Sequence, residues 1–398
     1  MPLDQPARRH DLDWVRIAAF GLLILYHVGM YYVSWDWHVK SPAASSAIEP
    51  LMRLSSPWRL ALLFLVSGAA TAFLLSRRPA GFAAARSGRL LVPLAFGMLV
   101  VVVPQPYYEV VEKLGYDEGF MAFYGRYLSA DGSFCSARNC LLLPTWNHLW
   151  FVAYLWVYSM LLWAALKRLP GPLARCEAVV AQRLRGVGVL LWPAAWLAAV
   201  RVGLVGWFPS THALVDDWYN HALFGSVFVL GFLIARHEAV WDAMLRLRWV
   251  ALALAAAAYG FITWYFGTYS DAVPPPDALR LAQRVVYALN QWAAIVSVLG
   301  FARSFAPGDG PARRYLTQAV FPFYIVHQSA IVVMAYHLKP LALAPAFEGP
   351  LLIVATFATC FASYELIRRV AWLRPLFGLP RRERTESTAV GGVDAARA

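Results

Sequence analysis

The sequence predicts an all-α integral membrane protein with about ten transmembrane helices and both termini in the cytoplasm. Hydrophobic residues make up 60% of the 398 residues, and charged residues only 15%. This balance excludes an ordinary soluble domain, in which roughly 25% of the residues are charged. The apolar residues also gather in stretches close to the roughly 20 residues that a helix needs to cross the hydrocarbon core.

Each predicted span is an apolar stretch between polar or charged segments. In chain order, the ten spans are 14–34, 58–76, 88–106, 147–166, 187–207, 218–235, 249–268, 283–304, 318–337 and 348–370. They form one predicted transmembrane domain over residues 1–377. The remaining segment, 378–398, is polar and charged, so we expect it to be a disordered cytoplasmic tail.

Basic residues are divided unequally between the two sides of this predicted bundle. Most lie in one set of segments: 1–13, 77–87, 167–186, 236–248, 305–317 and 371–398. The opposite loops carry Lys40, Arg53, Lys113, Arg126, Arg138, Arg280 and Lys339. The positive-inside rule assigns the first set to the cytoplasm and predicts a multi-pass protein of a bacterial inner membrane. The net charge of +12 is explained by this topology, and we expect no nucleic-acid partner because no base-reading motif accompanies it.

The first span contains an ionisable residue, His27, inside an apolar run that follows Arg16. Eleven residues make about three helical turns, so the two side chains share one helix face about 16 Å apart along the axis. Ionisable groups at membrane depth are costly and therefore indicate a functional site. The alternative is a histidine held only by a neighbouring helix.

The third span begins with Arg86 and Arg89, which lie at positions i and i+3 on one helix face. A guanidinium group can hold phosphate oxygens in a bidentate manner. Together with Arg16 at a similar depth, the pair predicts a site for an anionic ligand at the cytoplasmic end. Arginines that merely reach out to the membrane interface are the alternative.

Further candidates lie in other spans. Tyr324 and His327 share a face of the ninth span and could bind an acceptor or support an oxyanion. His148 begins the fourth span, where it could bind the substrate or simply lie at the outer surface. We interpret its neighbours Trp146 and Trp150 as anchors at the membrane interface.

Two arginines in outer halves of spans, Arg59 and Arg201, could receive a carboxylate or could extend outward to water. We rank Arg59 first because the second span should lie next to the first. Asp13 is predicted to pair with an arginine, and Glu365 with Arg368 and Arg369.

Cys135 and Cys140 fall in the long outer loop 107–146. They could form a disulfide in an oxidising compartment or remain two free thiols. No second pair of ligands lies nearby in the sequence, so we expect no metal site.

The Arg16-x10-His27 and Arg86-x-x-Arg89 patterns resemble the membrane acyltransferase-3 family. The resemblance runs from Asp13 to about Phe377. Within that family the sequence is similar to the glucan succinyltransferase branch, the glucan biosynthesis protein C group. The stretches that carry this similarity are Trp37–Ser41, Phe64–Gly68, His148–Phe151, Tyr324–His327, Tyr364–Glu365 and Leu373–Phe377.

This resemblance implies transfer of an acyl group from a cytoplasmic acyl-CoA to a hydroxyl of a periplasmic glucan or oligosaccharide. Succinyl-CoA is the favoured co-substrate, and no tightly bound cofactor is expected. Arg16, Arg86 and Arg89 would hold the CoA phosphates, His27 would act as general base, and transfer would be direct. The implied partners are the bilayer, the glycan, the acyl donor and a glucan synthase.

Two alternatives remain at this point. An O-acetyltransferase would use acetyl-CoA on a surface glycan, and no single residue distinguishes the two donors. A multi-span solute transporter would also bury arginine and histidine, but such transporters typically contain internal repeats, and no clear repeat is visible here.

Overall fold

The computed structural model is built from helices and describes residues 9–77, 80–136, 140–305 and 308–381. Within these ranges, eight helical segments are long and apolar enough to cross a membrane. They are His10–Tyr32, Ser46–Ser76, Phe82–Leu114, Asn147–Arg168, Glu238–Thr268, Asp277–Phe305, Pro311–Leu341 and Pro345–Arg369. The prediction of a helical multi-pass membrane protein agrees with these segments.

The individual helices include interruptions that the apolar pattern alone does not reveal. The long ones are α1 (His10–Tyr32), α3 (Arg59–Arg77), α4 (Phe82–Phe96), α7 (Trp150–Arg168), α9 (Gly188–Leu204), α12 (Glu238–Thr268), α13 (Asp277–Phe305), α14 (Pro311–Leu338) and α15 (Pro345–Arg369). The shorter ones are α2 (Glu49–Ser55), α5 (Pro104–Leu114), α6 (Phe120–Leu128), α8 (Pro170–Arg183), α10 (Trp218–Asn220), α11 (Ser226–Ile234) and α16 (Leu373–Leu376). Two π-helical turns, Gly97–Val101 and His221–Gly225, and short 3-10 turns connect some of them.

All ten predicted spans fall on helices. Two of them, however, are too short as single helices to count among the eight that can cross a membrane. The fifth predicted span corresponds to α9, which forms a pair with α8 bent by 116°. The sixth corresponds to the shorter apolar segment Trp218–Ile234. The sequence did not predict α8 as a helix, because its mixed composition resembles that of a connecting loop.

Glycines allow α3 and α11 to approach each other closely. A Cβ atom on Gly68 would lie 1.9 Å from the Phe228 carbonyl oxygen, and one on Gly231 would lie 2.0 Å from the Leu65 carbonyl oxygen. Each glycine therefore makes room for the backbone of the other helix. Small residues at such contacts are typical of membrane helix packing, in which van der Waals contact replaces the hydrophobic effect.

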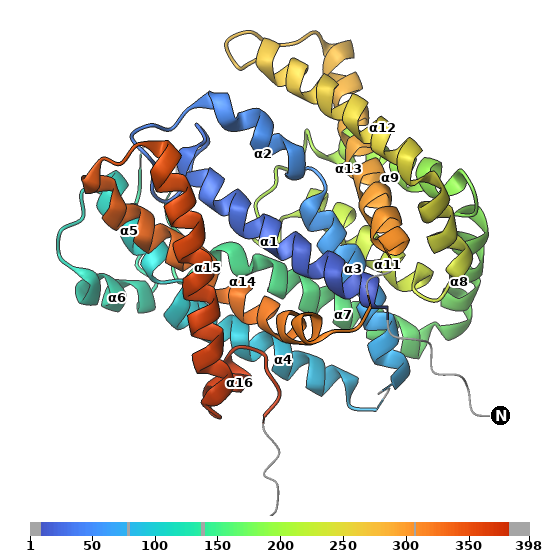
Figure 1. Cartoon of the computed structure of the whole chain (residues 1–398), viewed down its shortest axis with the longest axis horizontal. Coiled ribbons are helices and arrows are strands. Elements are labelled where there is room, and N and C mark those ends of the chain that lie inside the picture. Colours follow the sequence, from blue (N-terminus) through green and yellow to red (C-terminus); the bar gives the residue numbers. More distant parts are fainter. Residues whose placement is uncertain (1–8, 78–79, 137–139, 306–307, 382–398) are drawn as a thin grey trace, which may run out of the picture.

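Helix α1 lies within the bundle and contacts α3, α13, α14 and α15. Figure 1 shows α1 crossing the middle of the molecule, whereas α12 and α13 extend together beyond the rest of the bundle. Residues on several faces of α1 are therefore covered by other helices. This environment explains how a histidine in an apolar helix can meet polar partners.

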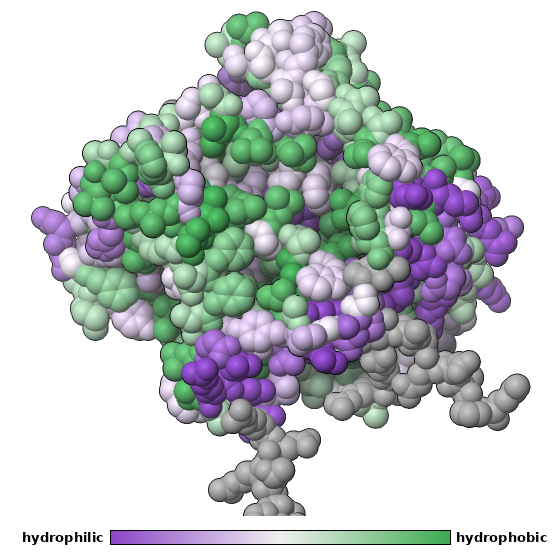
Figure 2. Space-filling model, viewed as in Figure 1, coloured by the Kyte–Doolittle hydropathy of each residue, from purple (hydrophilic) through white to green (hydrophobic). Residues whose placement is uncertain are grey.

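The viewed surface is broadly apolar across its middle, and hydrophilic residues gather along its lower edge (Figure 2). Large apolar side chains that are exposed in the structure include Leu191, Trp192, Trp196 and Trp249. Exposed apolar surface of this extent is expected where lipid, rather than water, surrounds a protein.

The third predicted span is continuous but irregular, since a π-helical turn over Gly97–Val101 separates α4 from α5. A Cβ atom on Gly97 would lie 2.4 Å from the Leu149 side chain, so glycine lets the start of α7 come close. The carbonyl oxygen of Val101 in this turn accepts a hydrogen bond from Ser329 Oγ at 2.5 Å. The third, fourth and ninth predicted spans thus meet at this irregular turn, next to His148.

Both predicted structural ion pairs are confirmed. Asp13 on α1 pairs with the buried Arg313 of α14. Glu365 contacts Arg368 at 2.9 Å and Arg369 at 3.0 Å. Both carboxylates are thus paired with arginines of the protein, and we assign neither of them a catalytic role.

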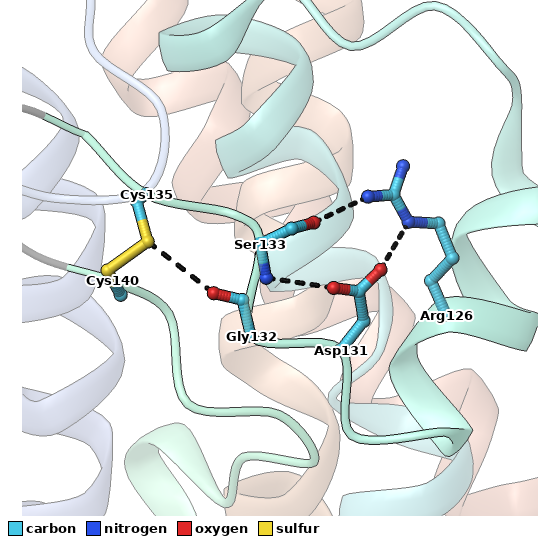
Figure 3. The surroundings of a disulfide bond; sticks show 6 residues. All are labelled: Arg126, Asp131, Gly132, Ser133, Cys135 and Cys140. Carbon is cyan, nitrogen blue, oxygen red and sulfur yellow. Dashed lines mark hydrogen bonds and ion pairs between the residues drawn. A yellow bond between two sulfur atoms is a disulfide. The ribbon is translucent and has the colours of Figure 1, made fainter.

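Cys135 and Cys140 form a disulfide with an S–S distance of 2.06 Å (Figure 3). The bond closes a short loop after α6. Beside it, Arg126 donates to Asp131 at 2.7 Å, and this hydrogen bond lowers the pKa of the Asp131 carboxyl group to about 2. The disulfide alternative, which the sequence left open, is the one present.

Ordered packing continues slightly past the predicted domain boundary at 377. Leu379 is buried and belongs to the main hydrophobic core. Most of the predicted tail, residues 382–398, lies outside the described residues.

Candidate functional site

His27 of α1 meets His327 of α14 inside the bundle. The Nδ1 atom of His27 lies 3.0 Å from Nε2 of His327, and the ring centroids are 5.0 Å apart. The two histidines are 300 positions apart in the chain, so no local sequence pattern reveals the pair, although both were predicted separately as site residues.

The proton positions on this pair follow from a backbone carbonyl. His327 Nδ1 lies 2.7 Å from the Tyr324 carbonyl oxygen, which can only accept, so His327 carries its proton on Nδ1. In neutral His327, Nε2 is then an acceptor, and His27 must donate to it from Nδ1. The remaining nitrogen of neutral His27, Nε2, therefore has a free lone pair.

His148 is braced against α14 rather than left free. Its Nε2 atom lies 3.0 Å from the Tyr324 carbonyl oxygen, so it is the donor nitrogen. Its Nδ1 atom lies 3.3 Å from the amide nitrogen of Gln105. In return, the Tyr324 hydroxyl donates to the His148 carbonyl oxygen. Both nitrogens of His148 are occupied, which suits a residue that positions its neighbours.

A cavity of about 570 Å³ opens beside His27, and we call it the histidine cavity. Four of the predicted site residues line it: His27, Arg59, His148 and Tyr324. His327 does not line the cavity, but it contacts His27, which does. The cavity wall also includes Trp37, His38, Trp146, Asn147, Trp150 and Gln328.

Trp146 and Trp150, which we interpreted from the sequence as interface anchors, face a cavity inside the bundle. Both line the histidine cavity, and Trp150 is only 8% exposed. Trp150 stacks on His212 with a centroid distance of 4.2 Å, and Trp146 donates to the His212 carbonyl oxygen at 3.0 Å. Their position at the end of a span fits an interface belt, but the chain around His212 folds over them.

Arg59 is a buried cation in the wall of the histidine cavity. It is 3% exposed, and its Cζ atom lies 3.7 Å from the centre of the Tyr26 ring. Its NH1 atom donates to Ser55 Oγ at 3.0 Å, and its Nε atom has no partner. Among the described residues, no Asp or Glu forms an ion pair with Arg59. The guanidinium group is therefore held by neutral groups only.

Arg201 lies elsewhere. Its NH1 atom donates to the Tyr219 hydroxyl at 2.7 Å, and its Cζ atom lies 3.6 Å from the centre of the Tyr287 ring. It does not line the histidine cavity. Of the two arginines considered for a carboxylate, only Arg59 shares a cavity with His27.

The three remaining arginines come together at a second, smaller hollow of about 150 Å³, the arginine hollow. Arg16, Arg86 and Arg89 all line it, from α1 and α4. Arg86 Nε donates to Ser159 Oγ at 3.2 Å, and Arg16 NH2 donates to the Thr317 carbonyl oxygen at 3.2 Å. None of the ion pairs between described residues involves Arg86 or Arg89.

The two hollows share a wall. Phe20 and Phe151 line both of them, and each ring lies near Tyr324, with centroids 5.5 Å and 6.1 Å apart. Arg16, Phe20 and His27 all face these hollows, so the predicted common face of α1 is confirmed. A ligand that reached from the arginines to His27 would pass this aromatic partition.

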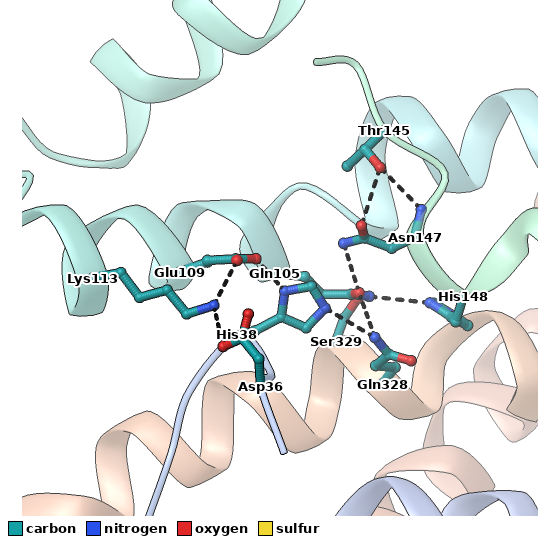
Figure 4. A network of polar contacts seen from close by, with 10 residues as sticks. All are labelled: Asp36, His38, Gln105, Glu109, Lys113, Thr145, Asn147, His148, Gln328 and Ser329. Carbon is teal, nitrogen blue, oxygen red and sulfur yellow. Dashed lines mark hydrogen bonds and ion pairs between the residues drawn. The ribbon is translucent and has the colours of Figure 1, made fainter. Parts of the chain in front are cut away.

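A polar network beside His148 was not predicted. It connects His38, Gln105, Glu109, Asn147 and Gln328 (Figure 4). The available sequence signal was weak: Gln328 follows His327 directly, and Gln105 interrupts an apolar span. Among the described residues, no group of three or more His, Cys, Asp or Glu side chains could hold a metal ion.

A family model described as an acyltransferase domain, that of the acyltransferase-3 family, matches residues 9–365. The chain belongs to this family. No curated protein and no solved structure matches the chain. As a member of the acyltransferase-3 family, the protein is a multi-pass membrane acyltransferase, and membership favours acyl transfer over the transporter alternative.

Proposed function

We propose that this acyltransferase lies in a bacterial inner membrane and transfers the succinyl group of succinyl-CoA to hydroxyls of a periplasmic glucan. The observation that carries the succinyl assignment is Arg59, a buried cation with neutral partners in the same cavity as His27. A buried charge without a counter-ion is costly, and a carboxylate on the acyl group would neutralise it.

The proposed donor site is the arginine hollow. Arg16, Arg86 and Arg89 would bind phosphate oxygens of CoA, since guanidinium groups match their geometry. The thin pantetheine arm would then extend past Phe20 and Phe151 and bring the thioester to the histidine cavity. The succinyl carboxylate would lie against Arg59.

The proposed reaction uses the free lone pair of His27. The acceptor hydroxyl attacks the thioester carbonyl carbon while its proton moves to His27 Nε2. The C–S bond then breaks, and the departing CoA thiolate takes the proton back from Nε2. The hydrogen bond from His27 Nδ1 to His327 supports the transient imidazolium, as an acceptor that stays in place throughout.

Arg59 should determine donor preference. Replacing Arg59 with Met is expected to lower kcat/KM for succinyl-CoA by about 100-fold, because the substrate carboxylate would be buried without its partner. The effect on acetyl-CoA, which has no such carboxylate, should be small. Initial rates with the two labelled donors and a glucan acceptor provide the measurement.

Arg201→Met is the matched control, because Arg201 also packs on a tyrosine ring but lies outside the histidine cavity. It should change the rates with both donors equally. If Arg59→Met lowers kcat/KM equally for both donors, Arg59 has only a packing role. A wild-type preference for acetyl-CoA would overturn the succinyl assignment itself.

His327 should act by orienting His27. Replacing His327 with Leu is expected to lower kcat by about 10- to 100-fold, since His27 Nδ1–H would lose its buried acceptor. His327→Gln should recover much of this loss, because a carboxamide can accept from His27 and donate to the Tyr324 carbonyl. Equal activity of the Leu and Gln variants would contradict a positioning role.

A further inference from the structure

The polar network in Figure 4 has only one consistent set of hydrogen-bond directions. The Val101 carbonyl oxygen can only accept, so Ser329 Oγ is the donor to it. Ser329 Oγ must then accept from the Gln105 amide nitrogen, which lies 2.7 Å away. These two bonds fix which end of the Gln105 carboxamide is oxygen, an assignment that otherwise depends on its neighbours.

The direction of each further bond follows from Gln105. Its Oε1 atom accepts from Asn147 at 3.0 Å and from the amide nitrogen of Gln328 at 3.1 Å. The same Gln328 nitrogen lies 3.1 Å from His38 Nε2. His38 Nδ1 lies 2.5 Å from the Glu109 carboxylate and donates to it, so Nε2 is free to accept from Gln328. Both protons of the Gln328 amide are thus used within the protein.

One atom of this network remains without a partner. Gln328 Oε1 is buried and makes no hydrogen bond, although Gln328 lines the histidine cavity and is only 4% exposed. An unsatisfied buried acceptor is costly, and each one in a native structure calls for an explanation. A ligand that supplies an O–H or N–H group in the cavity would satisfy it.

The surroundings favour a sugar as the source of that group. Trp37, Trp146 and Trp150 line the same cavity, and aromatic rings with polar neighbours suit the apolar faces of sugar rings. Gln328 also follows His327, whose ring holds His27 Nδ1. A sugar bound at Gln328 would therefore present another of its hydroxyls near the base.

We propose that Gln328 Oε1 accepts a hydrogen bond from a hydroxyl of the acceptor sugar that is not itself acylated. Gln328 thereby determines which hydroxyl faces His27 Nε2, so it is a specificity-determining residue. This inference rests on the proposed function, since it assumes a glycan acceptor. His38 and Glu109 are positioning residues, because His38 accepts from the Gln328 amide nitrogen and is itself held by Glu109, which fixes which end of the Gln328 carboxamide is oxygen.

The test compares Gln328→Met with the wild-type protein. Methionine nearly preserves the side-chain volume but removes the acceptor oxygen. The KM for glucan should rise about 10-fold, and product analysis by NMR should reveal acylation at additional hydroxyls. The KM for succinyl-CoA should stay unchanged, because the proposed phosphate-binding arginines line the arginine hollow and Gln328 does not.

Gln283→Met is the matched control. Gln283 is also buried in a span and also has an unpaired amide atom, but it does not line the histidine cavity. It should leave the KM for glucan and the acylated position unchanged. An unchanged KM for glucan with unchanged product in Gln328→Met would overturn the inference. A rise in the KM for succinyl-CoA alone would also overturn it, by assigning Gln328 to a pantetheine amide.

Binding without catalysis separates this inference from the proposed function. Titration of cavity tryptophan fluorescence with a glucose oligosaccharide needs no acyl donor and should show about 10-fold weaker binding in Gln328→Met. A failed transfer assay with weakened binding would contradict the proposed reaction and support the Gln328 site. If the variant does not fold, wild-type protein with monodeoxy-glucosides gives the answer: one missing hydroxyl should weaken binding about 10-fold, and equal affinity across the series would overturn the site.

Discussion

Replacing His27 with Asn is expected to lower kcat for acyl transfer by about 100-fold or more. Asparagine places an amide nitrogen near the position of imidazole Nδ1, so it can still donate to His327 Nε2. It has nothing in the place of Nε2, the nitrogen with the free lone pair. The substitution therefore removes the base and retains the contact between α1 and α14. Rates with labelled succinyl-CoA and glucan provide the measurement.

The control for His27→Asn is donor binding. CoA affinity measured by calorimetry should remain within about twofold of wild type, because His27 lines the histidine cavity and not the arginine hollow. The midpoint of thermal unfolding in detergent should also change little. Wild-type turnover in this variant would show that another group removes the proton.

Substituting Lys for Arg86 or Arg89 is expected to weaken CoA binding by about 10-fold each. The net charge is retained, but a lysine ammonium group cannot provide the planar fork that binds two phosphate oxygens at once. Neither arginine forms an ion pair with a described carboxylate, so both are available to an anionic ligand. Isothermal titration with CoA, repeated in low and high salt, measures the effect.

Arg248→Lys is the matched control for this experiment. Arg248 of α12 donates to the Leu245 carbonyl oxygen at 2.6 Å and does not line the arginine hollow. Its replacement should leave CoA affinity unchanged. If Arg86→Lys and Arg89→Lys bind CoA as tightly as the wild-type protein does, the arginine pair serves only membrane topology, and the donor site must lie elsewhere.

Long apolar spans were easier to predict from the sequence than short or bent ones. Where an apolar run is long, as in 283–304, the cost of leaving it in water determines both its helical state and its burial. The segments 187–207 and 218–235 are apolar too, but α9 follows α8 after a 116° bend and Trp218–Ile234 is short. Hydropathy reports how apolar a stretch is, and neighbouring helices decide where it bends or ends.

The site was predictable where residues share one helix. Arg16, Phe20 and His27 follow the helical period, so their common face is a property of α1 alone. The same holds for Arg86 and Arg89 on α4. Trp150 illustrates the limit: its position at the end of a span suggested an interface anchor, but a distant loop carrying His212 covers it.

The short motifs of the sequence resembled the acyltransferase-3 family, and the family match over residues 9–365 confirms that resemblance. The sequence by itself also determined that the protein is a helical membrane protein with an arginine and a histidine on one face of its first span. Those features depend on composition and on the fixed period of a helix, both of which are local. Only the tertiary structure decided that His327 sets the proton position on His27, that Arg59 rather than Arg201 shares its cavity, and that Gln328 retains an unused acceptor. These features depend on contacts between helices far apart in the chain, which arise from packing and have no local pattern.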